Sequence, residues 1–566
     1  MNEIPAVKIA ATLVAPTKLV NLVKPRHLID SSKCECYVDI GFFFDGTNNN
    51  GKNDKPKLGH SNIVRLYDSY LANPKKQKFA HYMYGVGTAF PEINESGQSS
   101  LGNGFGIGCE ARVLYAMLHL LDTIHRIVFD EALFSKIQVR ALCSVGIKAA
   151  ASSAHADALA ELGLDSGLLM PDFFGAGIRD TFFKAKIEEM TLKFASAKKP
   201  IIKECFLDVF GFSRGAAQAR VFCSWLEQLM DGGRFAGIPV RFRFLGIMDT
   251  VASGGFWSSV NAGLRNVPGG HSGWADVKYL RIPKIIENCV HMVAMHELRK
   301  NFPLDEAGVD GVLPPNTQEF AYPGAHSDVG GGYDPAELGV SVGTDWTISD
   351  SLKLAQIPLN HMYDCAVAAG VPLDKRRAVV GKWYDPFAMA PALIKAYNDF
   401  LTVSSCTARP MNAWSQRYLN WRWQNRLTYS SLEHVKKSNK SDRVKLEKFN
   451  KILIDDAELI EHAASPKTQS GILSFISSAA SETTDKVRTS VLDKEAGKVL
   501  SLAKASAKVN ATEAHFFDNY VHDSLAGFDR ASIEMTGYWR YRKGFIGGEM
   551  GGIVMNEAKP DDAQAA

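Results

Sequence analysis

The clearest candidate for chemistry in this chain is the segment Gly211-Phe212-Ser213-Arg214-Gly215, a serine between two glycines. An apolar run over 205–210 precedes it, and a run with helical spacing over 216–230 follows it. G-x-S-x-G between a strand and a helix is typical of the nucleophile elbow of serine hydrolases. The small flanking residues let the backbone approach itself closely. The pattern predicts Ser213 as a nucleophile, with an ordinary strand-to-helix turn as the alternative.

A serine hydroxyl needs a histidine as base, and the histidine needs a carboxylate to orient it. In α/β-hydrolases these residues follow the order nucleophile, acid, histidine, and they lie at the carboxyl ends of strands. Asp249 ends an expected strand over 240–248, and His326 lies in the loop after an expected strand over 319–322. Order and placement therefore predict a triad of Ser213, Asp249 and His326.

Other acids and histidines compete for these roles. Asp276 and Asp305 lie between the serine and His326, but neither follows a clear strand. His522 is the main alternative base, because many hydrolases carry their histidine late in the chain. The remaining histidines are weaker candidates, since two lie in a run that looks helical and one in a loop with no strand before it. They are His291, His296 and His271.

An oxyanion hole requires two N–H donors near the nucleophile. The N–H of Arg214 follows Ser213 at the start of the expected helix. The second donor is expected in the loop after a strand over 37–44, where Gly46 and Thr47 are candidates. Asp45 is expected to hold that loop by hydrogen bonds rather than to take part in the reaction.

Two other features have weaker chemical interpretations. The glycine-rich stretch around Gly104 and Gly106 lacks the full spacing of a dinucleotide loop and the Lys-Ser/Thr of a Walker loop. Asp328 is expected to brace the His326 loop, with cation binding as the less favoured alternative. No metal and no cofactor is expected.

Composition places the chain among ordinary globular proteins. It has 566 residues, 46% of them hydrophobic and 22% charged, with a net charge of +3. This small charge gives no reason to expect a nucleic-acid partner. Nine scattered cysteines, an odd number, indicate free thiols and synthesis in a reducing compartment. Neither a secretory signal peptide nor a transmembrane helix is expected.

The predicted fold class is α/β: an α/β-hydrolase-like, mostly parallel sheet with helical insertions and a largely helical second module. Residues 1–32 form a lead-in, and 33–340 the catalytic domain with a helical insertion at about 131–200. Residues 341–566 form the mostly helical module, in which the aromatic-rich tail 511–555 is expected to return to the core.

Four segments together resemble one family, the catalytic domain of the Tle1-type phospholipase effectors of the bacterial type VI secretion system. They are Phe44–Asn49, Gly211–Ala216, Gly246–Val251 and His326–Tyr333. The resemblance covers about 35–340 without the insertion. Residues 298–303 also resemble a family segment, although His296 stands where an acid would be expected.

The resemblance implies an antibacterial serine phospholipase A that uses Ser213, Asp249 and His326 on acyl esters of glycerophospholipids. It implies synthesis in the cytoplasm, delivery into the periplasm of a target cell, a secretion spike or tube protein as carrier, and an immunity protein. A soluble esterase or thioesterase and a non-catalytic, secretion-associated binding protein remain the alternatives.

The resemblance also implies a largely helical module that contacts the bacterial membrane surface; here it would be the 131–200 insertion, the region after 340, or both. Two places in this sequence are candidates for this contact: the apolar island within 467–480, and the tryptophans from Trp414 to Trp423. Aromatic stripes of this kind more often belong to a core.

Overall fold

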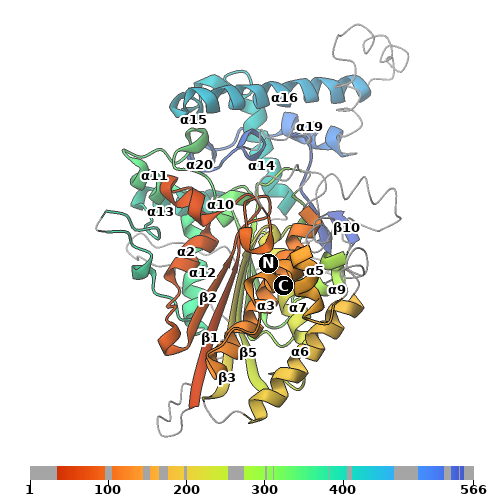
Figure 1. The fold of residues 1–566 in the computed structure, drawn as a ribbon. Helices are drawn as coiled ribbons and strands as arrows, with labels where there is room; N and C mark the ends of the chain where they lie inside the picture. The colour runs from red at the N-terminus through yellow and green to blue at the C-terminus, as the bar shows by residue number, and fades with distance from the viewer. Residues whose placement is uncertain are drawn as a thin grey trace, which may run out of the picture.

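The computed structural model describes most of the chain (Figure 1). Gly104, the lead-in 1–32 and the apolar island within 467–480 lie outside the described residues, whereas Gly106 lies in the helix Phe105–Phe129. The described residues are 35–95, 105–144, 153–164, 176–196, 200–252, 273–299, 302–309, 312–381, 383–404, 411–464, 495–527, 537–546 and 549–552.

The centre of the fold is a seven-stranded sheet in the order β2-β1-β3-β5-β6-β8, with β4 paired to β5 outside this path. The six strands on the path run parallel, and only β4 is antiparallel to its neighbour. The strands are β1 (Glu35–Phe44), β2 (Lys78–Met83), β3 (Ile201–Phe212), β4 (Arg234–Phe235), β5 (Ile238–Met248), β6 (Cys289–Ala294) and β8 (Thr317–Tyr322). This architecture confirms the predicted α/β class.

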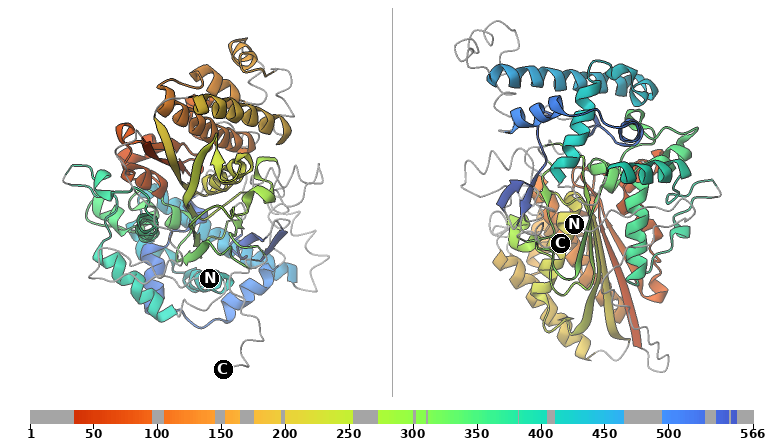
Figure 2. Two further views of the ribbon diagram at one scale, coloured as in Figure 1. Left: turned by 90° about the horizontal axis from the view of Figure 1, so that it is seen from below. Right: turned by 180° about the vertical axis from the view of Figure 1, so that it is seen from behind.

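Helices cover both faces of the sheet, as a buried parallel sheet requires (Figures 1 and 2). One face packs against α2 (Asn62–Ser69) and α12 (Gln356–Ala368), and the other against α3 (Phe105–Phe129) and α7 (Arg214–Leu229). Three further helices lie in the interval where an insertion was predicted, and their apolar residues join the core on the α3 and α7 side. They are α4 (Lys136–Cys143), α5 (Ser153–Ala160) and α6 (Ala176–Ser196).

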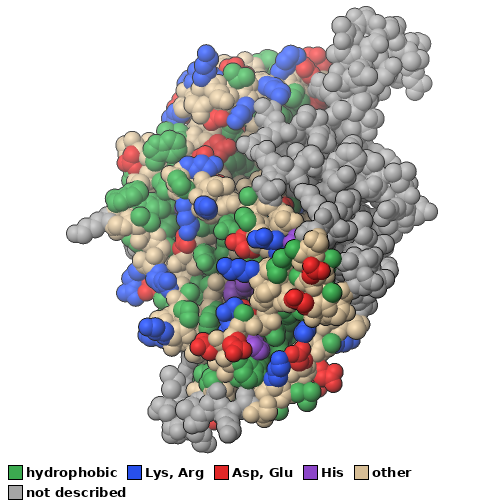
Figure 3. All heavy atoms as spheres, in the orientation of Figure 1, with side chains coloured by type: hydrophobic (Ala, Val, Ile, Leu, Met, Phe, Trp, Pro, Cys, Tyr) green, Lys and Arg blue, Asp and Glu red, His purple; other side chains and the backbone are tan. Residues whose placement is uncertain are grey.

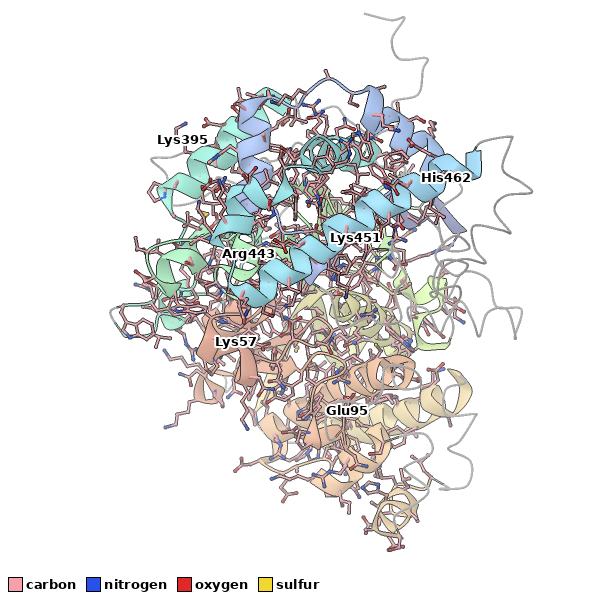
Figure 4. All side chains as sticks on the ribbon, turned by 90° about the horizontal axis from the view of Figure 1, so that it is seen from above. Lys57, Glu95, Lys395, Arg443, Lys451 and His462 are labelled. Carbon is pink, nitrogen blue, oxygen red and sulfur yellow. The ribbon has the colours of Figure 1, made fainter. Side chains whose placement is uncertain are left out.

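A helical layer lies over the carboxyl ends of the strands (Figures 1 and 2). Its longest member, α16, crosses the top of the molecule and carries Arg443, Lys451 and His462 along its length (Figure 4). The layer shares one hydrophobic core with the sheet, and the Ser415 hydroxyl donates to the Met295 carbonyl at 3.1 Å. Its helices are α11 (Trp346–Leu352), α13 (Pro391–Ser404), α14 (Met411–Asn425), α15 (Glu433–Lys437), α16 (Lys440–Ala464), α19 (Ala496–Ala505), α20 (Ala511–Tyr520) and α21 (Ser524–Gly527).

A late segment of the chain returns to the sheet domain. The strand β9 (Lys543–Ile546) pairs in parallel with β7 (Leu304–Asp305) and antiparallel with β10 (Glu549–Gly552). The remaining α-helices of the described residues are short: α1 (Gly51–Asp54), α9 (Val277–Leu280) and α10 (His326–Gly330).

The helical interpretation of the run around His291 was wrong. Residues 289–294 form the central strand β6, which is buried along its whole length. A strand with both faces covered is continuously apolar and lacks the alternation that identifies a half-exposed strand. The His291 side chain is satisfied inside the protein by Glu319 and by Thr250.

The tryptophans of α14 belong to the core. Trp414 and Trp421 are buried, and Trp423 packs edge-on against the buried Trp539, with 5.4 Å between ring centroids. The hypothesis that this cluster contacts a membrane was therefore wrong. Within the described ranges, no helix combines the length and apolarity needed to cross a bilayer, and the described cysteines are all free thiols.

Candidate active site

Ser213 lies at the apex of the turn between β3 and α7, in a backbone conformation that few residues adopt. Its φ is 59° and its ψ is −124°. A non-glycine residue with positive φ is uncommon and strained, and such strain concentrates at functional sites. The serine itself carries the unusual dihedrals, as expected of a nucleophile elbow.

The two flanking glycines are required by close backbone contacts. A Cβ on Gly211 would lie 2.4 Å from the Gly215 carbonyl oxygen, and a Cβ on Gly215 would lie 2.2 Å from that of Phe44. Both obstacles are backbone atoms, which a side-chain rotation cannot relieve. The glycines therefore let α7 start directly against β3 and β1.

The turn is fastened to the loop after β5. The Ser213 N–H donates to the Met248 carbonyl at 2.9 Å, and the Val251 N–H donates to the Ser213 carbonyl at 3.2 Å. These two bonds bracket Asp249, so the serine and the aspartate lie on adjoining strand ends. The Ser213 hydroxyl is buried and has no hydrogen-bond partner within the described part of the chain.

Asp249 and His326 are in direct contact. The His326 Nδ1 donates to Asp249 Oδ2, while the Ala294 N–H donates to Oδ1 of the same carboxylate at 2.8 Å. Because an ionised carboxylate only accepts hydrogen bonds, the proton lies on Nδ1 and the basic lone pair is on Nε2. The imidazole lies between two aromatic rings, 4.6 Å from that of Phe212 and 4.8 Å from that of Phe302.

Burial and charge set the protonation states of this pair. Burial alone would raise the pKa of Asp249, but Arg542 and the bond from His326 outweigh it and hold that pKa well below its usual range. Burial lowers the pKa of His326, although Asp249 opposes this effect. The pair is therefore an ionised aspartate beside a neutral imidazole, which is the state a general base requires.

Asp45 organises the loop after β1, as the sequence suggested. Its carboxylate accepts hydrogen bonds from the Gly46 N–H at 2.8 Å, from the Ser61 hydroxyl at 2.5 Å, and from Tyr82. Burial raises the pKa of Asp45 to about 7. Since the Gly46 N–H is already paired, Thr47 is the better candidate for an oxyanion donor on this loop.

Arg214 links that loop to the nucleophile turn. It is the first residue of α7, and its guanidinium donates to the Thr47 hydroxyl at 2.8 Å. The N–H groups at a helix start point away from the helix and attract negative charge. The Arg214 side chain therefore links the start of α7 to the loop that carries Thr47.

The structure separates His522 from the aspartate of the candidate triad. His522 Nδ1 bonds to Asp328 at 2.6 Å, and the His522 N–H donates to the same carboxylate at 3.1 Å. Asp328 thus braces its loop, as predicted. His296 accepts the Gly324 N–H at 2.9 Å, and burial lowers its pKa to about 3.

The rival acids have other partners. Asp276 caps α9 by accepting the Lys278 N–H at 3.0 Å, and Asp305 accepts the Ala252 N–H at 2.6 Å. The rival His271 lies outside the described residues.

Two buried charged residues around the triad had no signal in the sequence. Arg542 donates to both carboxylate oxygens of Asp249, at 2.7 and 2.8 Å. Glu297 accepts the backbone N–H of His326 at 3.1 Å and two bonds from the Arg299 guanidinium at 2.9 Å. Each of these charged residues lies within a hydrophobic or aromatic stretch of the sequence. That pattern suggests burial, but it does not identify the residue's partner.

Part of the chain matches a known protein family. Residues 40–128 and 228–365 match the family model described as the type VI secretion system phospholipase effector Tle1-like catalytic domain. No curated protein sequence gives a significant match.

Two solved structures are similar to the chain. An uncharacterized protein from Pseudomonas aeruginosa has a TM-score of 0.64 and 24% identity, over 92% of this chain and 81% of that one, which shows a shared fold. A structure of the Tle1 effector bound to the VgrG spike has a TM-score of 0.33 and 17% identity, over 69% of this chain and 84% of that one. The matched part of this chain is therefore similar to the catalytic domain of the Tle1-like phospholipase effectors of the type VI secretion system.

Proposed function

We propose that this protein is a serine phospholipase A that hydrolyses acyl esters of membrane glycerophospholipids through Ser213, Asp249 and His326. The observation that carries the proposal is the strained Ser213 turn fastened beside the Asp249–His326 pair. A nucleophile on a strained elbow next to an imidazole that is hydrogen-bonded to a carboxylate is the arrangement that acyl transfer requires. The match to a phospholipase effector family supports a lipid ester as the substrate.

In the first half of the reaction, the Ser213 oxygen attacks the ester carbonyl carbon. His326 Nε2 takes the hydroxyl proton, and Asp249 stabilises the imidazolium through Nδ1. The tetrahedral intermediate collapses when the imidazolium gives its proton to the leaving glycerol oxygen. The products of this half are a lysophospholipid and an acyl group on Ser213.

In the second half, water takes the place of the alcohol. His326 removes a proton from the water, which attacks the acyl carbonyl and releases the fatty acid and the free serine. In both halves the negative oxygen of the intermediate needs N–H donors, and we assign these to Arg214 and Thr47. The hydrogen bond from the Arg214 guanidinium to the Thr47 hydroxyl links the two segments that carry these donors.

One experiment tests the proposal directly. A phosphatidylcholine with different acyl chains at its two positions is incubated in vesicles with the wild type or with Ser213→Ala, and the products are identified by mass. We expect one fatty acid and one lysophospholipid from the wild type, which also reveals the position cleaved. Full activity of a folded Ser213→Ala variant would refute the serine mechanism.

The competing enzymatic function is that of a soluble esterase or thioesterase. The two are separated by comparing a monomeric short-chain ester with the same ester bond in a bilayer. A phospholipase is expected to work faster at the lipid interface, whereas a soluble esterase shows no gain there. A non-catalytic binding protein, the third alternative, would remain toxic as Ser213→Ala.

We assign the contact with the bacterial membrane to a patch of exposed apolar side chains, here called the Trp346–Trp383 surface. Trp346 is 62% exposed and Trp383 65% exposed, and hydrophobic side chains gather over α11 and α13 in Figure 3. The other exposed members are Ile348, Val379 and Val380. Tryptophan is favoured at membrane–water interfaces because its ring is amphipathic.

Two features beside these tryptophans suit a phospholipid bilayer. The side chains of Ile348, Val379 and Trp383 help to line an open hollow of about 280 Å³. The basic run Lys375–Arg377 comes two residues before Val379 and supplies positive charge for anionic head groups. A bilayer is therefore the partner that this surface fits best.

The remaining partners follow from the family. A type VI effector is carried by a spike or tube protein, acts in the periplasm of the target cell after synthesis in the producer's cytoplasm, and is neutralised in the producer by an immunity protein. We propose each of these for this chain, and co-purification with the spike proteins of the producing cell tests the first of them.

A further inference from the structure

We propose that Arg542 is a positioning residue of the triad: it holds the Asp249 carboxylate in the orientation and charge state that His326 needs. This inference rests on the proposed serine mechanism. The two residues are 293 positions apart, so the arrangement of the reacting groups depends on a segment far outside the catalytic sequence motifs.

The contacts of Arg542 leave its guanidinium little freedom. Two of its nitrogens donate to the two oxygens of Asp249, at 2.7 and 2.8 Å. Its Nε donates to the Phe302 carbonyl at 2.8 Å, and one terminal nitrogen also reaches the Ala294 carbonyl at 3.3 Å. A two-bond fork onto a carboxylate fixes the plane of the carboxylate as well as its position.

The geometry of Asp249 explains why such a clamp matters. Its Oδ2 is shared by His326 and Arg542, and its Oδ1 by the Ala294 N–H and Arg542. Without Arg542, each oxygen of Asp249 would keep one hydrogen-bond partner. The buried carboxylate would also lose the one cationic side chain that contacts it among the described residues. A carboxylate free to turn holds the imidazole less firmly, and small misplacements of a reacting group are costly in rate.

The charges facing His326 come from four places in the fold. Asp249 follows β5, Arg542 precedes β9, and Glu297 and Arg299 follow β6. Asp328 lies on the same short helix as His326 and is occupied by His522. The positive charge of Arg542 therefore partly cancels the negative charge of Asp249, so Asp249 stabilises the imidazolium form of His326 less strongly.

Further groups pack around the loop that carries Asp249. His291 on β6 contacts Thr250, and its other ring nitrogen bonds to Glu319 on β8. Asp305 on β7 accepts the Ala252 N–H and is joined by its own N–H to the Thr250 carbonyl. These groups satisfy one another, which leaves Arg542 as the cation in direct contact with Asp249 among the described residues.

The segment that carries Arg542 is fixed independently of that contact. β9 pairs with β7, Tyr538 donates to Asp523 at 2.7 Å, and the Trp539 indole donates to the Leu453 carbonyl at 3.0 Å. Arg540, two residues earlier, donates to the Leu298 carbonyl at 2.8 Å. Arg540 is thus a natural control: an equally buried arginine of the same segment that contacts backbone instead of Asp249.

The test uses the full chain with monomeric dihexanoyl-phosphatidylcholine, so that membrane binding does not contribute. We compare kcat/KM against pH for the wild type, Arg542→Gln, Arg542→Lys and Arg540→Gln, with thermal unfolding measured for each. For Arg542→Gln we expect kcat to fall up to about a hundredfold and the acidic limb of the profile to move up by about one pH unit. The shift has this sign because removal of the cation favours the imidazolium.

The conservative variant and chemical rescue distinguish a loss of positioning from a loss of folding. Arg542→Lys retains a charge without the fork, so we expect a wild-type acidic limb with a lower kcat. Millimolar guanidinium is expected to restore part of the activity of Arg542→Ala, and to do nothing for Arg540→Gln. The proposal is overturned if Arg542→Gln and Arg542→Lys both keep the wild-type kcat and profile, or if Arg540→Gln moves the acidic limb equally.

These outcomes are distinct from failure of the proposed function. If Ser213→Ala hydrolyses the same lipid at the wild-type rate, the serine mechanism itself is wrong. If Ser213→Ala is inactive while the Arg542 variants behave as the wild type, the mechanism stands and only the role of Arg542 is refuted.

Discussion

Asp328 is joined to His522 through two hydrogen bonds. The ring nitrogen of His522 lies 2.6 Å from one carboxylate oxygen, and the backbone N–H lies 3.1 Å from the other. The His522 ring also stacks on Tyr333, with 3.8 Å between centroids. Since Asp328 is two residues from His326 on α10, this pair fastens the short helix that carries the proposed base.

The roles of the two histidines can therefore be separated by substitution. We expect His326→Ala to lower kcat about 10³-fold or more, because the nucleophile loses its base. His522→Ala is expected to keep activity within about tenfold but to lose about 1–3 kcal/mol of stability, because the buried Asp328 loses its side-chain partner and keeps only backbone N–H donors. Steady-state kinetics and urea unfolding of both variants measure this, and the reverse ranking of activities would make His522 the base.

The pH dependence of hydrolysis should reflect the buried state of His326. Burial lowers the pKa of this imidazole below its ordinary value of 6.5, and only the neutral form accepts the serine proton. We therefore expect activity to be kept as the pH falls through 6.5 and to be lost at a lower pH. The measurement is kcat/KM from about pH 4 to pH 9, with circular dichroism at each pH to exclude unfolding.

A second group titrates near neutrality and needs its own control. Because burial raises the pKa of Asp45 to about 7, the profile is repeated with Asp45→Asn. An acidic limb that stays below pH 6.5 in both proteins assigns it to His326. A midpoint at or above the ordinary histidine value would contradict the expectation.

The flanking glycines of the elbow should be intolerant of even one extra carbon. A Cβ on Gly215 would meet the Phe44 and Asp45 carbonyl oxygens at 2.2 and 2.5 Å. We expect Gly215→Ala to cost at least about 1–3 kcal/mol of stability, the usual range for overpacking, and to abolish hydrolysis. Urea unfolding and product analysis are the measurements.

Gly497 on α19 is the matched control for that substitution. A Cβ there has only Ile460 near it, at 3.9 Å. Alanine in place of a helical glycine is expected to stabilise by about 0.5–1 kcal/mol, with unchanged activity. Equal behaviour of Gly215→Ala and Gly497→Ala would mean that the close approach at the elbow has no consequence.

The Trp346–Trp383 surface should matter only when the substrate is a bilayer. We expect Trp346→Ser with Trp383→Ser to weaken sedimentation with anionic phospholipid vesicles and to slow vesicle hydrolysis, because two interfacial rings are lost. Hydrolysis of monomeric dihexanoyl-phosphatidylcholine should be unchanged. The control removes two exposed apolar residues elsewhere, Leu192 and Leu427, and equal losses in the control would show that the effect is general hydrophobicity.

Asp350, on α11 of the helical layer, should be a major contributor to stability. Its carboxylate receives two bonds from Arg65, at 2.7 and 2.9 Å, and lies 2.6 Å from Lys353. Removing one partner of a buried ion pair leaves an uncompensated charge. We therefore expect Asp350→Asn to lose about 3–5 kcal/mol in urea unfolding, while Asp374→Asn, which breaks a surface pair with Arg376, changes little.

The same carboxylate predicts a dependence of stability on pH. Burial would raise the pKa of Asp350, but Arg65 and Lys353 outweigh it and hold the pKa well below 3.8. Its contribution is therefore present above the ordinary aspartate pKa and is lost as the pH falls through the depressed value. A wild-type advantage over Asp350→Asn that does not shrink below about pH 4 would contradict this assignment.

Local sequence determined the elements whose signals are short-range. The strand before Ser213, the glycines around it and the helix after it are each decided by neighbouring residues, so the turn was predictable. Asp249 and His326 were found because parallel strands bring their carboxyl ends to one edge, and that rule needs only strand ends in order. No such rule could decide whether the aromatic residues of α14 face the core or a membrane, because a buried stripe and a membrane-facing stripe have the same spacing.

Only the tertiary structure decided which partners meet across the chain. β6 was mistaken for a helix because a strand covered on both faces has no alternation. The pairing of Arg542 with Asp249 joins residues 293 positions apart, and nothing in the spacing of either residue indicates the other. The candidate nucleophile Ser213 was evident in its own sequence. The charges around Asp249 and His326 depended on the packing of the whole chain, because buried charges must find partners wherever the fold brings them.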